Sequence, residues 1–301
     1  MGVNCSRRMV FSLSLLILSL AVLTTLPLTN AQTFTWATVK SPTSNELDSV
    51  FCVSASDCWA VGKSGTIIQW KGVSWATVKS PTSNNLARMF CVSASDCWAV
   101  SLQSTIIYWN GVSWATVKSP TSNTLYSVFC VSASDCWAVG KSGTIIQWKG
   151  VSWATVKSPT SNTLYSVFCV SASDCWVVGG VIIQWNGVSW ATVKTPAFTW
   201  SVFCVSASDC WAVGRQGVII QWNGVSWATV TSPTSNELDQ VFCVSASDCW
   251  AVGWQSTIIQ WNGVSWATVT SPTSNYPYSV FCVSASDCWA VGKSGTIIHG
   301  T

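Results

Sequence analysis

A nine-residue stretch containing two cysteines, an aspartate and a tryptophan occurs seven times in this chain. The stretch is Phe-Cys-Val-Ser-Ala-Ser-Asp-Cys-Trp, at residues 51–59, 90–98, 129–137, 168–176, 203–211, 242–250 and 281–289. Cysteine and aspartate can bind metals, form disulfides or act as acids and bases. The copies start 39 residues apart, with one interval of 35, and such a fixed period indicates a repeat architecture. The same residues are therefore expected to build a scaffold.

The N-terminus has the pattern of an export signal. Arg7 and Arg8 supply positive charge, residues 9–26 are mostly apolar, and residues 29–31 offer small side chains for cleavage. We predict a signal peptide at 1–31, cleaved after Ala31, and one domain at 32–301 that is secreted or held at the cell surface. An uncleaved membrane anchor and a twin-arginine leader remain alternatives.

Export favours disulfides for the cysteines, because oxidised pairs persist outside the cytosol. Apart from Cys5 in the leader, every repeat carries two cysteines six residues apart. Zinc is disfavoured, because this spacing is not that of zinc ligands and His299 is the only histidine. We predict seven disulfides, one per repeat: Cys52 with Cys58, Cys91 with Cys97, Cys130 with Cys136, Cys169 with Cys175, Cys204 with Cys210, Cys243 with Cys249, and Cys282 with Cys288.

Composition and residue types argue against an enzyme and against several partners. Removing Arg7 and Arg8 from the 14 basic residues leaves 12 against 11 acidic residues, so nothing draws the chain to nucleic acid or to an anionic membrane. Only Arg88 and Arg215 remain as arginines, too few for a sialidase-like triad. His299 is expected to be structural rather than part of a catalytic triad. We expect no catalytic residues, no cofactor and no metal.

Two acidic pairs could be imagined as glycosidase carboxylates. They are Glu46/Asp48 and Glu237/Asp239, and both are expected to be solvated charges in loops. The aspartate of each nine-residue stretch, such as Asp57, is expected to cap its turn by bonds from its side chain to the backbone.

Each repeat contains four short β-prone runs separated by turn residues. In the first repeat these runs are residues 50–53, 58–61, 66–70 and 74–78, and Lys71-Gly72 is expected to form a tight hairpin turn. Four antiparallel strands repeated seven times are the pattern of an all-β, seven-bladed β-propeller. The recurring tryptophans, such as Trp59, Trp70 and Trp75, are expected to pack between blades.

The two ends of the repeat array complement each other. Residues 34–39 match a fourth strand without the preceding three, whereas the last repeat has three strands, ends at 296–299, and lacks the fourth. We predict that the N-terminal strand joins the C-terminal blade and closes the ring, which removes an exposed edge. A linear solenoid is the alternative, but it would need polar caps that the sequence lacks.

The motif around residues 57–75 resembles the propellers of the photosystem II stability and assembly factor family. It reads Asp-Cys-Trp-Ala-Val-Gly-Lys-Ser-Gly-Thr-Ile-Ile, followed by Trp70-Lys-Gly-Val-Ser-Trp75, and it is also similar to the wider BNR/Asp-box class that includes sialidases. The chain departs from that pattern in two ways: Asn or Lys replaces the acidic residue before Gly, and paired cysteines are added. The resemblance implies a blade type, and no photosystem role follows from it.

Differences between the repeats concentrate in two loops, one joining each repeat to the next and one joining the second and third strands. Alternate connections of an antiparallel blade lie at the same end, so both loops are expected on one face. Aromatic and arginine side chains are typical interface anchors. We therefore predict binding residues on this variable face, although drift between recent duplicates is an equal alternative: Arg88, Tyr126, Tyr165, Trp200, Arg215, Trp254, Tyr276 and Tyr278.

The sequence thus predicts a non-enzymatic, monomeric scaffold that binds a protein or peptide. A carbohydrate-binding or glycoside-hydrolase-like propeller is one alternative, so a glycan partner stays open. An exported assembly factor is another.

Overall fold

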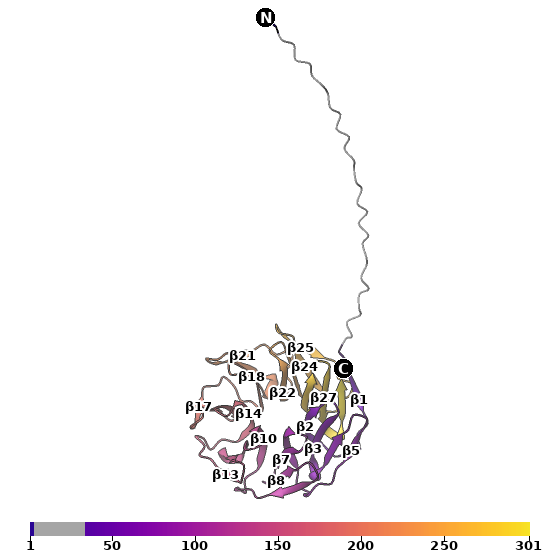
Figure 1. The fold of residues 1–301 in the computed structure, drawn as a ribbon, viewed down its shortest axis with the longest axis vertical. Coiled ribbons are helices and arrows are strands. Elements are labelled where there is room, and N and C mark those ends of the chain that lie inside the picture. Colours follow the sequence, from indigo (N-terminus) through magenta and orange to yellow (C-terminus); the bar gives the residue numbers. More distant parts are fainter. Residues whose placement is uncertain (3–33) are drawn as a thin grey trace. The chain divides into compact units, whose positions relative to one another are not determined.

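A computed structural model describes residues 1–2 and 34–301, so the predicted signal peptide at 1–31 lies almost entirely outside the described residues. From Phe34 to Thr301 the chain forms seven four-stranded antiparallel sheets, arranged as blades around a central channel (Figure 1). The predicted seven-bladed β-propeller is confirmed. Within the described ranges, no helix is long and apolar enough to cross a membrane.

The first blade contains β2 (Leu47–Ser54), β3 (Asp57–Gly62), β4 (Ile67–Trp70) and β5 (Trp75–Thr77), with β2 against the channel. The next five blades repeat this order as β6 (Leu86–Ser93), β7 (Asp96–Ser101), β8 (Ile106–Trp109), β9 (Trp114–Val117); β10 (Leu125–Ser132), β11 (Asp135–Gly140), β12 (Ile145–Trp148), β13 (Trp153–Thr155); β14 (Leu164–Ser171), β15 (Asp174–Gly179), β16 (Ile182–Trp185), β17 (Trp190–Val193); β18 (Ser201–Ser206), β19 (Asp209–Val213), β20 (Ile219–Trp222), β21 (Trp227–Val230); and β22 (Leu238–Ser245), β23 (Asp248–Gly253), β24 (Thr257–Trp261), β25 (Trp266–Val269). Short 3-10 turns follow the second strand in four blades: η1 (Lys63–Gly65), η2 (Lys141–Gly143), η3 (Arg215–Gly217) and η4 (Lys293–Gly295).

The seventh blade combines the two ends of the domain. It contains β26 (Pro277–Ser284), β27 (Asp287–Gly292), β28 (Ile297–Gly300) and, from the N-terminus, β1 (Trp36–Val39). Strand β1 pairs antiparallel with β28, and the backbone N–H groups of Thr35 and Thr301 each donate to the other residue's carbonyl, at 2.9 and 3.0 Å. The predicted closure of the ring by the N-terminal strand is confirmed.

Tryptophans link each blade to the next. Trp59 in β3 is fully buried, and its ring lies 5.0 Å from Trp109 and 5.6 Å from Trp114 of the following blade. At the closing interface, Trp250 instead contacts Phe34 at 4.7 Å and Trp36 at 5.5 Å. These contacts confirm that the recurring tryptophans pack between blades.

Gly300 explains why Phe34 takes part in the closure. It occupies the position at which the other blades carry the tryptophan that ends the third strand, for example Trp109. A Cβ atom at Gly300 would lie 2.4 Å from the ring of Phe34. The missing tryptophan therefore leaves room for the phenylalanine that arrives from the opposite end of the domain.

A disulfide links the first two strands of every blade. In the first blade, the two cysteines lie directly opposite each other on β2 and β3, and the Cα atoms of each of the seven bonded pairs are 3.9 Å apart. The predicted pairing within each hairpin is confirmed. The bonds join Cys52 to Cys58, Cys91 to Cys97, Cys130 to Cys136, Cys169 to Cys175, Cys204 to Cys210, Cys243 to Cys249, and Cys282 to Cys288.

Two local predictions were wrong. Asp57 Oδ1 accepts a hydrogen bond from the side chain of Gln69, at 2.9 Å, rather than capping the backbone of its turn. The turn between the third and fourth strands spans the four residues between paired Trp70 and Trp75, so Gly72 and its neighbours form a wider loop than a two-residue hairpin.

The lone histidine of the chain occupies the position of this glutamine in the last blade. His299 Nε2 lies 2.8 Å from Asp287 Oδ1, and its ring stacks on Trp289 with the centroids 4.0 Å apart. These contacts agree with the expected structural role of His299.

Candidate functional site at the channel mouth

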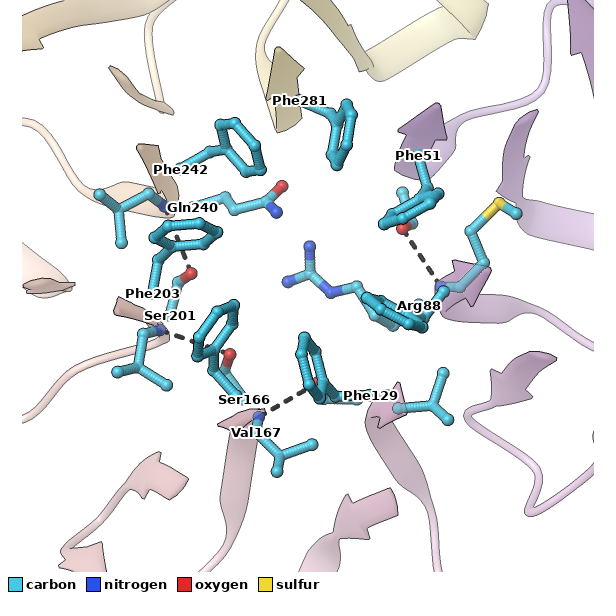
Figure 2. A pocket seen from close by; sticks show the side chains of 18 of the residues that line it. Phe51, Arg88, Phe129, Ser166, Val167, Ser201, Phe203, Gln240, Phe242 and Phe281 are labelled. Atoms are coloured by element: carbon cyan, nitrogen blue, oxygen red, sulfur yellow. Dashed lines mark hydrogen bonds between the residues drawn. The ribbon is translucent and has the colours of Figure 1, made fainter. Parts of the chain in front are cut away.

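Three layers of side chains line the channel, and the deepest is a belt of seven phenylalanines. Each ring contacts its two neighbours, with centroids 4.5–4.8 Å apart around the whole circle (Figure 2). The belt consists of Phe51, Phe90, Phe129, Phe168, Phe203, Phe242 and Phe281. One phenylalanine per repeat thus forms a continuous apolar ring.

The second layer lies two residues before each phenylalanine and hydrogen-bonds the blades to one another. Ser49 Oγ accepts from the backbone N–H of Met89 in the next blade at 3.2 Å, and Gln240 Oε1 accepts from Val280 at 3.0 Å. Six of the seven positions make this bond: Ser49, Ser127, Ser166, Ser201, Gln240 and Ser279. The seventh is Arg88, which has no acceptor to offer.

Arg88 points its guanidinium toward the middle of the channel (Figure 2). Its Nη1 is buried and has no hydrogen-bond partner among the described residues. Burial lowers the pKa of Arg88 to about 10, and the nearby Asp48 and Asp239 oppose part of that shift. The residue was expected in a loop, but it lies in β6, so its side chain is held by the sheet.

Replacing Arg88 by Ser is expected to raise the free energy of unfolding by about 1–3 kcal/mol. The variant removes a buried donor without a partner and supplies the acceptor that the other interfaces use for the backbone N–H, here that of Val128. Urea unfolding at pH 6 measures the effect, with Arg215→Ser on the loop face as the matched control. A less stable R88S variant would show that the guanidinium supports the fold.

The third layer forms the mouth and contains the greatest variation between repeats. It lies three residues before each phenylalanine, at Asp48, Ala87, Tyr126, Tyr165, Trp200, Asp239 and Tyr278. Together with Arg88 and Leu102, these side chains line a cavity of about 260 Å³. The seven positions come from seven blades, so only the closed ring brings them together.

In six of the seven blades, a β-bulge directs the third-layer side chain to the mouth; the fifth blade, which carries Trp200, has no bulge at this position. In the first blade Leu47 pairs with Gly62 and Ser49 pairs with Val61, which leaves Asp48 as an extra residue on β2. The bulge lets Leu47 point into the core, where it is fully buried, while Asp48 lines the cavity. Strict alternation along the strand would instead have placed Leu47 on the same side as Ser49, and Asp48 on the same side as buried Val50.

The expectation that Asp48 and Asp239 are solvated loop charges was wrong. Both lie in strands at the mouth, and Asp239 Oδ2 is buried without a partner among the described residues. Burial, followed by the charge of Glu46, raises the pKa of Asp48 to about 6. Burial, followed by the charge of Glu237, raises the pKa of Asp239 to about 7, and Arg88 counteracts both shifts only in part.

The two raised pKa values predict that stability falls as the pH rises. Asp48 and Asp239 bind protons more tightly in the folded than in the unfolded chain, so their contribution is greatest near pH 4 and is lost by about pH 8. We expect a loss of about 3 kcal/mol, roughly half the full linkage value because both side chains are partly exposed. Urea unfolding at several pH values tests this. The double variant Asp48→Asn/Asp239→Asn should flatten the profile, whereas Glu237→Gln should leave most of its slope.

Aromatic contacts extend from the mouth across the variable face. Tyr165 lies 5.0 Å from Tyr126 and 4.5 Å from Trp200, and the Arg215 guanidinium lies 5.0 Å from the Trp200 ring. Phe198, which the sequence did not single out, joins this group at 4.6 Å from Trp200. These contacts connect loop side chains to the wall of the cavity.

A second aromatic pair lies on the loops of the last two blades. Trp254 stacks on Tyr276 with ring centroids 5.7 Å apart, and the Lys293 ammonium lies 4.9 Å from the centroid of the Tyr276 ring. Trp254 remains about half exposed. This pair does not line the cavity.

Backbone hydrogen bonds place the two variable loops of each blade side by side. The N–H of Lys63 donates to Glu46 at 3.0 Å, and that of Lys293 donates to Tyr276 at 2.9 Å. The constant turns lie at the other ends of the strands, where Trp70 Nε1 donates to the Ala55 carbonyl. The variable loops therefore share one face.

The structure brings together five of the eight predicted binding residues around the cavity: Arg88, Tyr126, Tyr165, Trp200 and Tyr278. Arg215 contacts this group from the side, and Trp254 and Tyr276 form the separate pair. Asp48, Asp239 and Phe198 were not among the predicted binding residues. The repeat period could have identified the two aspartates, because they share one repeat position with the tyrosines.

The disulfide cysteines take no part in this site. The first cysteine of each pair follows a belt phenylalanine in the chain and is nearly buried, and the second is shut off from solvent completely. Both pack in the interface with the neighbouring blade, and neither lines the mouth cavity. No ligand or substrate can therefore reach the sulfur atoms of the second cysteines, which have no exposed surface: Cys58, Cys97, Cys136, Cys175, Cys210, Cys249 and Cys288.

The described part of the chain offers no cluster of metal ligands. Within it, no group of three or more His, Cys, Asp or Glu side chains could hold a metal ion.

Comparisons with known proteins identify the fold and no closer relationship. No protein-family model and no curated protein matches the sequence. Similar solved structures include YCF48 bound to D1 peptide, with 13% identity, a TM-score of 0.73, and coverage of 88% of this chain and 94% of that chain. Streptogramin B lyase has 13% identity, a TM-score of 0.79, and coverage of 89% and 97%. The WD40 propeller domain of Doa1 has 15% identity, a TM-score of 0.74, and coverage of 88% and 95%.

These similarities agree with the expected resemblance, because YCF48 is a photosystem II assembly factor. At such low identity they show the shared propeller fold alone. Both a lyase and non-enzymatic propellers appear among the similar structures, so the fold does not decide between catalysis and binding.

Proposed function

We propose that this protein is a non-enzymatic β-propeller scaffold, secreted or held at the cell surface, that binds a protein or peptide through its variable face. The chain acts as a monomer in this proposal, and its leader is cleaved after Ala31. The seven disulfides support an oxidising compartment.

One observation carries the proposal: the differences between nearly identical blades converge on one mouth. The opposite face repeats the same turns, and a surface with sevenfold repetition cannot distinguish one orientation of a partner from another. The mouth presents aromatic, acidic and cationic side chains in a single, unsymmetrical order. Such a surface can recognise one partner in one orientation.

Two further findings support binding to a peptide. One similar structure, that of YCF48, was solved with a bound D1 peptide, so this fold can bind a peptide. The aromatic group around Tyr165 and Trp200 is also pre-packed, which reduces the entropy lost when a partner binds.

Peptide display on the mature protein tests the proposal. We expect selected peptides to bind at least tenfold more weakly to Tyr165→Ser and to Trp254→Ser, because both variants remove aromatic anchors. Val112→Ser is the matched control, since Val112 lies in the turn after β8, away from the variable loops, and is almost fully exposed.

Three outcomes would contradict the proposal. Peptide binding could be lost in Val112→Ser and kept in the two variable-face variants. A glycan array could show specific sugar binding that depends on Tyr165, which would favour the carbohydrate-binding alternative. N-terminal sequencing of the exported protein could show an intact leader.

A further inference from the structure

Polar side-chain atoms without partners point to a ligand in the mouth cavity. Among the described residues, apart from indole N–H groups, four buried polar atoms lack a hydrogen-bond partner. They are Arg88 Nη1, Asp96 Oδ1, Thr199 Oγ1 and Asp239 Oδ2. Native proteins leave few such atoms, so each requires an explanation.

Two of the four follow from changes within the scaffold. Asp96 lacks its partner because Tyr108 replaces the glutamine that donates to this aspartate in the other blades. Thr199 stands where neighbouring blades carry a buried leucine, such as Leu238. Neither residue lines the mouth cavity.

The other two atoms face the same space. Arg88 and Asp239 both line the mouth cavity, and among the described residues no ion pair or hydrogen bond joins them, although they have opposite charge. One is a donor that needs an acceptor, and the other is an acceptor that needs a donor. The channel wall holds them apart, so a third group is required to satisfy both.

The charges around the cavity determine which kind of ligand group can bind between Arg88 and Asp239. A carboxylate ligand would suit Arg88, but it would meet Asp48 and Asp239, with Glu46 and Glu237 close by. An ammonium ligand would suit the aspartates, but it would be repelled by Arg88 and would leave Nη1 without an acceptor. A neutral group that both donates and accepts satisfies both residues without either repulsion.

We propose that the mouth binds the carboxamide side chain of a glutamine or asparagine in the peptide partner. Its carbonyl oxygen accepts from Arg88 Nη1, and its NH₂ group donates to Asp239 Oδ2. The aromatic wall of Tyr126, Tyr165 and Trp200 packs against the methylene part of the side chain. This inference rests on the proposed peptide-binding function and specifies its central contact.

A matched peptide series tests the inference. Peptides selected by display on the wild-type protein at pH 8 are expected to share a glutamine or asparagine at one position. Synthetic versions with Gln, Glu, Lys or Met at that position are then compared by biolayer interferometry. We expect the Gln peptide to bind at least tenfold more tightly than the other three, since Glu and Lys each lose one of the two hydrogen bonds and introduce a repelled charge, and Met loses both bonds.

Two variants connect this preference to the cavity. In Arg88→Ser and in Asp239→Ala, the preference for Gln should fall to less than threefold. Arg215→Ser is the control, because Arg215 contacts the outer aromatic group; it can weaken all four peptides but should keep their ratio. The unfolding curves of all three variants establish that they remain folded.

The possible failures are distinguishable. If no peptide binds the variable face, the proposed function itself fails. If peptides bind there but Lys, Glu or Met equals Gln, or if the preference survives in Arg88→Ser, only the carboxamide site is overturned. Competition by free sugars and not by the Gln peptide would also overturn it, since vicinal hydroxyls both donate and accept.

Discussion

Reduction of all seven disulfides is expected to unfold the propeller. Each bond closes a loop of seven residues, from Cys52 to Cys58 in the first blade, and contributes about 2 kcal/mol by restricting the unfolded chain. If the seven contributions add, their sum is about 14 kcal/mol, which equals the whole stability of many domains. The effect is large because a modest local constraint is repeated in every blade.

The measurement is urea unfolding, followed by tryptophan fluorescence, at increasing concentrations of reductant. Free thiols are counted in parallel, because buried disulfides need partial unfolding before a reductant reaches them. Removing a single disulfide calibrates the effect. Replacing Cys130 and Cys136 by Ala should lower the free energy of unfolding by about 2 kcal/mol, and removing the pair of any other complete blade should lower it by the same amount. A fully reduced protein with an unchanged unfolding midpoint would contradict this account.

Removal of the closing strand is the second large perturbation. A variant that begins at Ser41 lacks β1, so the backbone groups of β28 lose their partners and Trp250 loses its contacts with Phe34 and Trp36. Truncating one buried tryptophan to alanine costs about 3–5 kcal/mol, so we expect a loss of at least about 5 kcal/mol. The exposed edge of β28 should also pair with other molecules and produce oligomers.

A permuted chain provides the matched control for this deletion. It begins at Ser41 and carries residues 34–40 after Thr301, joined by the Asn-Gly-Val-Ser turn that connects the third and fourth strands of other blades. Because β1 already pairs antiparallel with β28, the permuted strand should return to its place and restore a stable monomer. Light scattering and urea unfolding compare the three proteins. A stable, monomeric deletion variant would show that ring closure contributes little.

The disulfides and the ring closure could both be predicted from the sequence, because the repeats make their patterns visible. The five residues between Cys52 and Cys58 are enough for a hairpin to bring the two cysteines together, so their spacing and its repetition predicted the bond, and a β-bulge between Cys52 and Ser54 places them directly opposite each other. The strand inventory was sufficient to predict closure, because an unmatched fourth strand at one end complements three strands at the other. Seven copies of one pattern also fixed the number of blades.

The mouth required the tertiary structure. Asp48 and Asp239 lie far apart in the chain, and each sits beside a loop where a carboxylate is ordinarily solvated. Their burial comes from a β-bulge and from the convergence of seven strands on one axis, and neither is a property of a single repeat. Sequence comparison of the repeats identified the variable positions but not the layer in which each side chain lies.

Arg88 and Phe34 also show which features the sequence predicts and which only the tertiary structure determines. The sequence marked Arg88 as one of two arginines in the domain, whereas the structure placed its guanidinium inside the channel, near an aspartate that it does not reach. Nothing in the sequence predicts that Phe34 contacts Trp250, and the cause is the absent side chain at Gly300 at the other end of the domain. Local, periodic patterns were thus determined by the sequence alone. Burial and charge at the mouth were decided only when the ring closed, because closure brings residues from every blade into one low-dielectric space.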